Sequence, residues 1–142
     1  MSVNVNRILK GNSGNVWFNG KLLATVKKIE AKITGDFEDD NFCGDNATYS
    51  LYNGWNGSGT LSMEKIDSSI WSMMCDAYKS GIMPTIKIIT SLTDKVTGKS
   101  ERASIEDIVI TEFMLVNFEA KTKVVEDFPF KFSNYEKLEA IA

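Results

Sequence analysis

The sequence predicts a mainly β protein, and three observations support that class. Short runs rich in β-branched and aromatic residues recur along the chain, with Gly- and Asn-containing turns between them. One stretch alone, residues 67–80, has convincing helical periodicity. The composition, with 43% hydrophobic and 25% charged residues, is ordinary for a folded domain. At 142 residues we expect a single domain spanning residues 1–142.

The N-terminal part predicts a hairpin followed by a bent strand. Residues 16–18 form an apolar run that ends at Asn19 and Gly20, a dipeptide suited to the positive φ angles of a tight turn. Apolar residues then alternate on one parity before Lys27 and on the opposite parity after it. A strand cannot change faces without a bulge, so we expect a bend near Lys27.

Residues 35–46 break this pattern. They are acidic, contain two glycines and show no consistent apolar face, which predicts a long loop or extended arm around residues 35–47. Residues 49–53 and 60–66 predict strands. The Gly-rich segment 54–59 between them predicts a loop, because glycine permits backbone conformations that other residues avoid.

Residues 67–80 predict a helix that packs on the sheet. Asp67, Ser68 or Ser69 can cap its first amides, and Gly81 is placed to end it. Apolar side chains spaced three and four apart favour helix packing on one side. This stripe consists of Ile70, Trp71, Met74, Ala77 and Tyr78.

Beyond the helix, the pattern returns to strands. Residues 94–99 predict a polar hairpin turn, and the apolar parity shifts between Ile105 and Ile108, which indicates a second bulge. Residues 124–132 predict the last strand, with three phenylalanines on one face.

No catalytic set emerges from these residues. The chain has no histidine, which excludes Ser-His, Cys-His and His-metal chemistry. Ser62 and Lys65 match a Ser-x-x-Lys motif, but they lie in an alternating strand without the helix start that this chemistry needs. Cys43 and Cys75 lack any Cys-x-x-Cys spacing and are interpreted as ordinary thiols. We therefore expect a protein that is not an enzyme and needs no cofactor.

The acidic segment partly follows the start of an EF-hand loop at Asp39, Asn41 and Gly44. Cys43 is a poor calcium ligand, and Ser50 stands where the bidentate glutamate belongs. No helices flank the segment. We expect no metal site, and interpret the segment as a solvated or partner-contacting arm.

Charge and hydropathy restrict partners and location. Sixteen basic and nineteen acidic residues give a net charge of −3, which disfavours a dedicated nucleic-acid reader. The N-terminus lacks the apolar region of a signal peptide, and no apolar run approaches the roughly 18 residues that span a bilayer. We expect synthesis in the cytoplasm and no membrane anchor.

A β domain with free strand edges must protect those edges or pair them with a neighbouring copy. Trp55 lies between glycines, so its ring either tucks back on the core or is offered to a partner; the sequence leaves both open. Physical reasoning alone thus reaches a β domain whose edges are either protected or paired with a neighbouring copy.

Several short motifs in a fixed order carry a family resemblance. They are Gly57-Ser58-Gly59-Thr60 leading to Lys65, Ser69, Met73-Met74, Lys79-Ser80-Gly81, Glu101-Arg102 and residues 129–135. Their order and spacing resemble the tail tube protein of contractile phages, of the type found in Gram-positive defective prophages and phage-tail-like bacteriocins.

The resemblance implies an antiparallel β-sandwich or partial barrel with one flanking α-helix. Six copies would close into a ring, and rings would stack into the rigid inner tube of a phage tail or bacteriocin, enclosed by a sheath and used to penetrate a target envelope. The implied partners are further copies of itself, the tail sheath protein, baseplate and tail terminator proteins, and DNA passing through the lumen without specific binding. The implied location is a virion or phage-tail-like particle made in the bacterial cytoplasm.

The resemblance also places the arm against the next ring. The residues expected in inter-subunit contact are Asp36, Glu38, Asp39, Asp40, Phe42, Asn46, Tyr49 and Trp55. A ring-forming secretion-tube protein of the same fold remains an alternative. A small-molecule-binding β-barrel is another, and it predicts a closed barrel of about eight strands around an apolar cavity.

Overall fold

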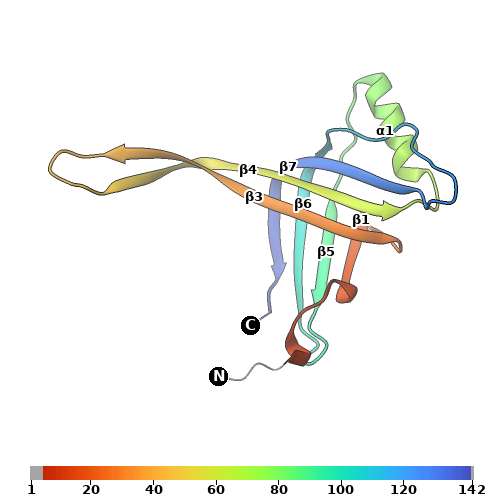
Figure 1. The fold of residues 1–142 in the computed structure, drawn as a ribbon, viewed down its shortest axis with the longest axis horizontal. Helices are drawn as coiled ribbons and strands as arrows, with labels where there is room; N and C mark the ends of the chain where they lie inside the picture. The colour runs from red at the N-terminus through yellow and green to blue at the C-terminus, as the bar shows by residue number, and fades with distance from the viewer. Residues whose placement is uncertain (1–4, 142) are drawn as a thin grey trace.

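The computed structural model describes residues 5–141, which form one antiparallel sheet of seven strands and a single α-helix (Figure 1). The strand order in the sheet is β2-β1-β5-β6-β7-β4-β3. The strands are β1 (Gly14–Phe18), β2 (Lys21–Leu22), β3 (Val26–Asn41), β4 (Thr48–Glu64), β5 (Ile88–Thr93), β6 (Ser100–Ile110) and β7 (Val125–Glu139), the helix is α1 (Ser69–Ser80), and two short 3-10 helices are η1 (Val5–Arg7) and η2 (Gly11–Ser13).

The sheet is an incomplete barrel. Its outermost strands, β2 and β3, are separated in the chain only by residues 23–25. At this link the Leu23 N–H donates to the Val16 carbonyl (2.9 Å), and the Glu64 N–H donates to the Thr25 carbonyl (3.0 Å). No ladder joins β2 to β3 in the described chain. The partial-barrel form of the expected fold is therefore the one found, and the closed barrel of a small-molecule binder is not.

The predicted first hairpin is confirmed. Asn19 and Gly20 have φ angles of 49° and 86°, the positive values that a two-residue turn of the primed type needs. The register of β3 against β4 shifts between Val26 and Lys28, which confirms the predicted bend near Lys27.

The predicted parity change in β6 also corresponds to a backbone irregularity. Ile105 pairs with Ile88, whereas the Ile108 N–H donates to the Ile86 carbonyl (3.4 Å), so β6 has one residue more than β5 across this stretch. Asp107 lies between them with φ 53°. The extra residue lets both Ile105 and Ile108 be buried.

Of the long loop or extended arm expected at residues 35–46, the structure has the extended arm, whereas the loop predicted at residues 54–59 was wrong. β3 and β4 pair continuously from Val26 with Met63 to Asn41 with Thr48, so residues 35–41 are strand and residues 54–59 lie inside β4. An antiparallel pair satisfies its backbone groups through the ladder even where neither face is apolar, and this pairing is not visible in a one-strand pattern. Of the glycines within residues 54–59, Gly54 alone has a positive φ, 137°.

Phenylalanines of β7 lie on glycines of β4. The directly opposite pairs are Leu61 with Phe128, Gly59 with Phe130 and Gly57 with Phe132. A Cβ on Gly59 would lie 2.6 Å from the Phe130 ring and 2.1 Å from the Glu30 carbonyl oxygen, and a Cβ on Gly57 would lie 2.5 Å from the Phe132 ring. These glycines provide the space in which the rings pack.

The helix begins two residues later than expected and ends as predicted at Gly81, which is left-handed with φ 76°. Ile70, Met74 and Ala77 are buried, and Trp71 is half-buried. Ile70 and Met74 join the core formed by β1, β4, β5, β6 and β7. Tyr78 lies at the margin, where its hydroxyl donates to the Ile110 carbonyl.

The predicted turn at residues 94–99 is built around Asp94, whose side chain is 3% exposed. The Val96 N–H donates to Oδ1 (3.0 Å), the Thr97 hydroxyl donates to Oδ2 (2.9 Å), and Arg7 Nε lies 3.7 Å from Oδ2. The Val96 hydrogen bond, supported by Thr97 and the Arg7 charge, holds the pKa of Asp94 below its usual value.

We predict that Gly59→Ala lowers the free energy of unfolding by about 1–3 kcal/mol, because the added methyl overlaps the Phe130 ring and the β3 backbone. Urea denaturation measures the loss. Gly11→Ala is the matched control, since nothing lies within 4 Å of its Cβ position, and should be nearly neutral. Equal stability of both variants would contradict the packing of Phe130 on Gly59.

We predict that Asp94→Asn lowers the melting temperature at pH 7. Because the folded-state pKa of Asp94 is depressed, its carboxylate contributes stability above the unfolded pKa of about 3.9, and this contribution is lost as pH falls through the folded pKa. The difference between wild type and variant should therefore shrink in acid. Asp76→Asn, at an exposed helix position, is the control and should show no such trend.

Candidate assembly surfaces

The outer part of the β3–β4 hairpin, residues 36–54, is here called the arm. β4 pairs with β7 only from Gly57 to Glu64, so beyond Gly57 the hairpin has no neighbouring strand on either side. Figure 1 shows it projecting from the rest of the sheet along the longest axis. An isolated two-stranded ribbon is marginally stable in water, so the arm needs further contacts to become rigid.

The arm ends in a defined turn. Asp45 accepts hydrogen bonds from the Ala47 N–H (2.9 Å) and the Tyr49 hydroxyl. The Tyr49 bond, with that from Ala47, lowers the pKa of Asp45, so this carboxylate stays charged. The Thr48 hydroxyl donates to the Asn41 side chain (2.9 Å). The arm is thus a paired hairpin with an ordered turn at its tip.

Aromatic side chains are exposed on the arm. Phe37 and Tyr52 face each other across the strands with ring centroids 5.5 Å apart, yet they are 58% and 62% exposed. Phe42 and Tyr49 form a second pair at 5.7 Å. Exposure of such rings to water is unfavourable, and their burial against a partner would lower the free energy of the assembly.

Acidic and basic residues are distributed unevenly between the arm and the rest of the chain. It carries five acidic residues and no lysine or arginine, whereas the rest of the chain carries 14 acidic and 16 basic residues. The five are Asp36, Glu38, Asp39, Asp40 and Asp45. None of them belongs to an ion pair within the described residues. The arm is therefore an acidic extension of a weakly basic body.

The structure places most of the expected contact residues on the arm. These are Asp36, Glu38, Asp39, Asp40, Phe42, Asn46 and Tyr49. Trp55 lies at its base, half-buried, with its ring centroid 5.9 Å from that of Phe132 and 5.2 Å from that of Tyr135. Sequence reasoning missed Phe37 and Tyr52, because their contact depends on the strand register.

Two strand edges are open. β3 is the outermost strand and pairs only with β4 along its 16 residues. β7 pairs with β6 as far as Glu139 but with β4 only as far as Phe132, so residues 133–139 have a free side. Unpaired edges of this length are sites where another chain can add strands.

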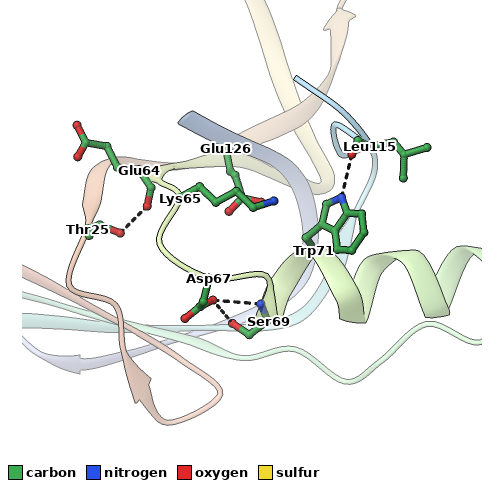
Figure 2. A network of polar contacts seen from close by, with 8 residues as sticks. All are labelled: Thr25, Glu64, Lys65, Asp67, Ser69, Trp71, Leu115 and Glu126. Atoms are coloured by element: carbon green, nitrogen blue, oxygen red, sulfur yellow. Dashed lines mark hydrogen bonds and ion pairs between the residues drawn. The ribbon is translucent and has the colours of Figure 1, made fainter. Parts of the chain in front are cut away.

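A second apolar surface lies beside α1, in the connection between β6 and β7. Met114, Leu115, Val116 and Phe118 are between 57% and 78% exposed, and are here called the 114–118 patch. The Trp71 Nε1–H donates to the Leu115 carbonyl (3.1 Å), and Figure 2 shows the Leu115 side chain pointing away from the indole. The sequence signal for this patch was the apolar run itself.

Polar contacts join several elements near this patch (Figure 2). Lys65 Nζ lies 5.2 Å from the Trp71 ring centroid and 3.7 Å from Glu126 Oε2. Burial raises the pKa of Glu126, and Lys65 opposes that rise. The Thr25 hydroxyl donates to the Glu64 carbonyl (2.7 Å). These contacts connect the start of β7 and the end of β4 to α1, and offer no nucleophile beside a base.

Besides these surfaces, the molecule has a groove, two cysteines and one short α-helix. A groove of about 690 Å³ runs between β3 and the strands β1, β5 and β6, and it is open to solvent along the gap in the barrel. Within residues 5–141 no group of three or more potential metal ligands is found. None of the helices described is long and apolar enough to cross a membrane. Cys43 lies exposed near the arm tip, far in sequence from the half-buried Cys75.

An incomplete antiparallel barrel with one helix, open edges and a projecting hairpin defines a subunit of a polymeric β assembly. A chain in the structure of the anti-feeding prophage cap has this fold, with a TM-score of 0.78 and 12% identity over 99% of this chain and 97% of that one. A chain of the PVC contractile injection system, from a sheath-tube complex in the extended state, aligns with a TM-score of 0.76 and 10% identity over 96% and 95%. The fold class predicted from the sequence is confirmed.

Residues 1–139 match the family described as "Phage tail tube protein", and the chain belongs to that family. It is 24% identical to the phage-like element PBSX protein XkdM of Bacillus subtilis (strain 168), over the whole chain and 98% of that protein. It is also 24% identical to protein YqbM of the same strain, over 96% of this chain and 94% of that protein. The family predicted from the motifs is confirmed, and the chain's role is structural, in a tail tube.

We predict that the double variant Phe37→Ser, Tyr52→Ser leaves the stability of the monomer nearly unchanged, because both rings are more than half exposed. Trp55→Ala should cost about 2 kcal/mol, because Trp55 packs on Phe132 and Tyr135. Chemical denaturation of both variants distinguishes a partner-facing position from a core-facing one. A large loss in the double variant would mean that the arm supports the body.

Proposed function

We propose that this protein forms hexameric rings that stack into the rigid inner tube of a contractile phage tail or phage-tail-like bacteriocin. A sheath encloses the tube and drives it through a target envelope when it shortens. The observation that supports this most is the combination of an open edge along β3 with an arm that has no contact beyond its own hairpin. Each feature is costly in a monomer and useful in a polymer.

Lateral contacts use the open edge. β6, β7, β4 and β3 are four consecutive strands of the sheet, and pairing of β3 with a neighbouring copy would extend them into a continuous barrel. The outward face of β4 carries small polar side chains, Ser58, Thr60 and Ser62, which suit a water-filled lumen that conducts DNA without binding it. Sixfold closure is favoured by a chain of the anti-feeding prophage baseplate, described as 6-fold symmetrised, which aligns with a TM-score of 0.64.

Axial contacts use the arm. It projects along the longest axis, beyond the body of its own subunit, and so is placed to overlap the next ring (Figure 1). The charges of the arm would set its register against the next ring more than they would strengthen binding. Its aromatic rings would supply the apolar area that is buried in the contact. A tube stiff enough to pierce an envelope needs interfaces of obligate type, of about 2,000 Å² or more. Contacts limited to the body edges would leave the arm rings in water.

The remaining partners follow from the same role. One similar chain comes from a PVC sheath-tube complex, and another, with a TM-score of 0.71, from a PVC structure described as a sheath/tube terminator. We expect this tube to contact a sheath protein on its outer surface, and baseplate and terminator proteins at its ends. The function is mechanical and needs no cofactor or catalytic group.

We predict that the purified protein forms hollow tubes or rings of uniform diameter in negative-stain electron microscopy across a concentration series. A variant in which Asn-Gly replaces residues 36–54 should abolish the tubes. Gly35 and Trp55 are directly opposite partners, so a two-residue turn can close the shortened hairpin and keep Trp55 in place.

The shortened variant should retain the melting temperature of the body, because the removed residues contact no other strand. Tubes of normal length from this variant would refute the role of the arm. Monomers alone from the full chain, at every concentration and salt and also with sheath and baseplate proteins added, would overturn the proposed function itself.

A further inference from the structure

We propose that the 114–118 patch is the surface that receives the arm of a second copy of this chain. The inference rests on the proposed tube and names the contact that stacks one ring on the next. Neither the family match nor the similar structures assign a role to this patch. Three independent observations lead to it: its preorganised exposure, its position and its charge.

The patch is exposed but held in place. Trp71 donates to the Leu115 carbonyl, and the Phe113 ring, which packs on the core, makes an edge contact with Tyr78 at 5.2 Å. Tyr78 in turn donates to the Ile110 carbonyl. The backbone before the patch, and the patch itself at Leu115, are thereby anchored to α1, while Val116 and Phe118 remain 70% and 78% exposed. An anchored loop that presents apolar side chains loses little entropy on binding.

The patch and the arm lie at opposite ends of the molecule. Figure 1 shows the arm projecting from one end of the longest axis, whereas α1 and the connection from β6 to β7 lie at the other end. A contact between these two surfaces is head-to-tail, so each copy uses one surface to bind the copy ahead and the other to bind the copy behind. Such a heterologous contact repeats without limit, as a stack of rings requires.

The chemistry of the two surfaces is complementary. The exposed aromatic rings of the arm match a patch of two aliphatic side chains, one phenylalanine and one methionine, and methionine adapts well to aromatic partners. Lys121 and Lys123 follow the patch, and Lys121 makes no ion pair within the described residues. Glu112 and Glu119 balance these lysines, so the loop is neutral. Lys123 is already paired with Glu64 at 3.4 Å, so Lys121 is the charge of this loop that is complementary to the arm, which has five acidic residues and no basic one.

The test is cysteine cross-linking in assembled protein. Val116→Cys is introduced in a Cys75→Ala background, and a short bis-maleimide is added to the polymer. The natural Cys43 reports on the arm tip, and Ser50→Cys, with Cys43→Ser, reports on the middle of the arm. Because each chain carries both surfaces, a head-to-tail contact produces a ladder of covalent multimers on a denaturing gel.

Val96→Cys is the matched control, since Val96 is also an exposed valine, in the turn between β5 and β6. We expect ladders with Val116→Cys from at least one arm position and none with Val96→Cys. Tubes in the microscope without a ladder from either arm position would overturn the patch and leave the proposed tube intact. A ladder without tubes would retain the contact and overturn the tube, and the absence of both would overturn both.

A second pair of variants tests the energetics. The double variant Val116→Asp, Phe118→Asp should raise the concentration needed for tubes at least about tenfold, because it places charge in the contact. Val96→Asp should leave that concentration unchanged. Both sites are exposed, so melting temperatures should match wild type and exclude misfolding as the cause. Normal tube formation by the double variant would refute the proposal.

Discussion

The structure depends on the packing of β7 phenylalanines over β4 glycines. Phe130 and Phe132 lie across from Gly59 and Gly57, in space that any Cβ would occupy. This contact attaches the long β3–β4 hairpin to the rest of the sheet and fixes its register against β7. Because the ladder between β4 and β7 ends at Gly57, the same contact determines where the hairpin leaves the body and the arm begins.

From that point outward, every feature favours assembly over a stable monomer. The arm has paired backbone groups but no core, and its rings and carboxylates face solvent. The outer side of β3 has unused hydrogen-bonding groups, and α1 anchors an apolar loop that covers nothing. A monomer retains these surfaces at a cost in solubility, whereas the proposed stack of rings would bury them. Membership of the tail tube family agrees with this physical interpretation.

Local signals in the sequence predicted much of the fold. Asn19-Gly20 predicted the first turn, the parity change at Lys27 predicted a bulge, and Gly81 predicted the helix end. The strands of the arm were missed, because their residues show no apolar alternation. That alternation records burial of one face, and the arm buries neither face within its own subunit. The contact of Phe37 with Tyr52 and the exposure of the 114–118 patch were likewise missed.

The sequence by itself therefore determined the β class, the turns, the helix, the lack of histidine chemistry and the family, since each depends on residue types within a short span. The tertiary structure decided which glycines serve backbone conformation and which make space for rings, how far the hairpin extends, and which apolar side chains stay in water. Those properties depend on strand register and on partners distant in the chain. One strand's pattern cannot specify them, because register is a relation between two strands.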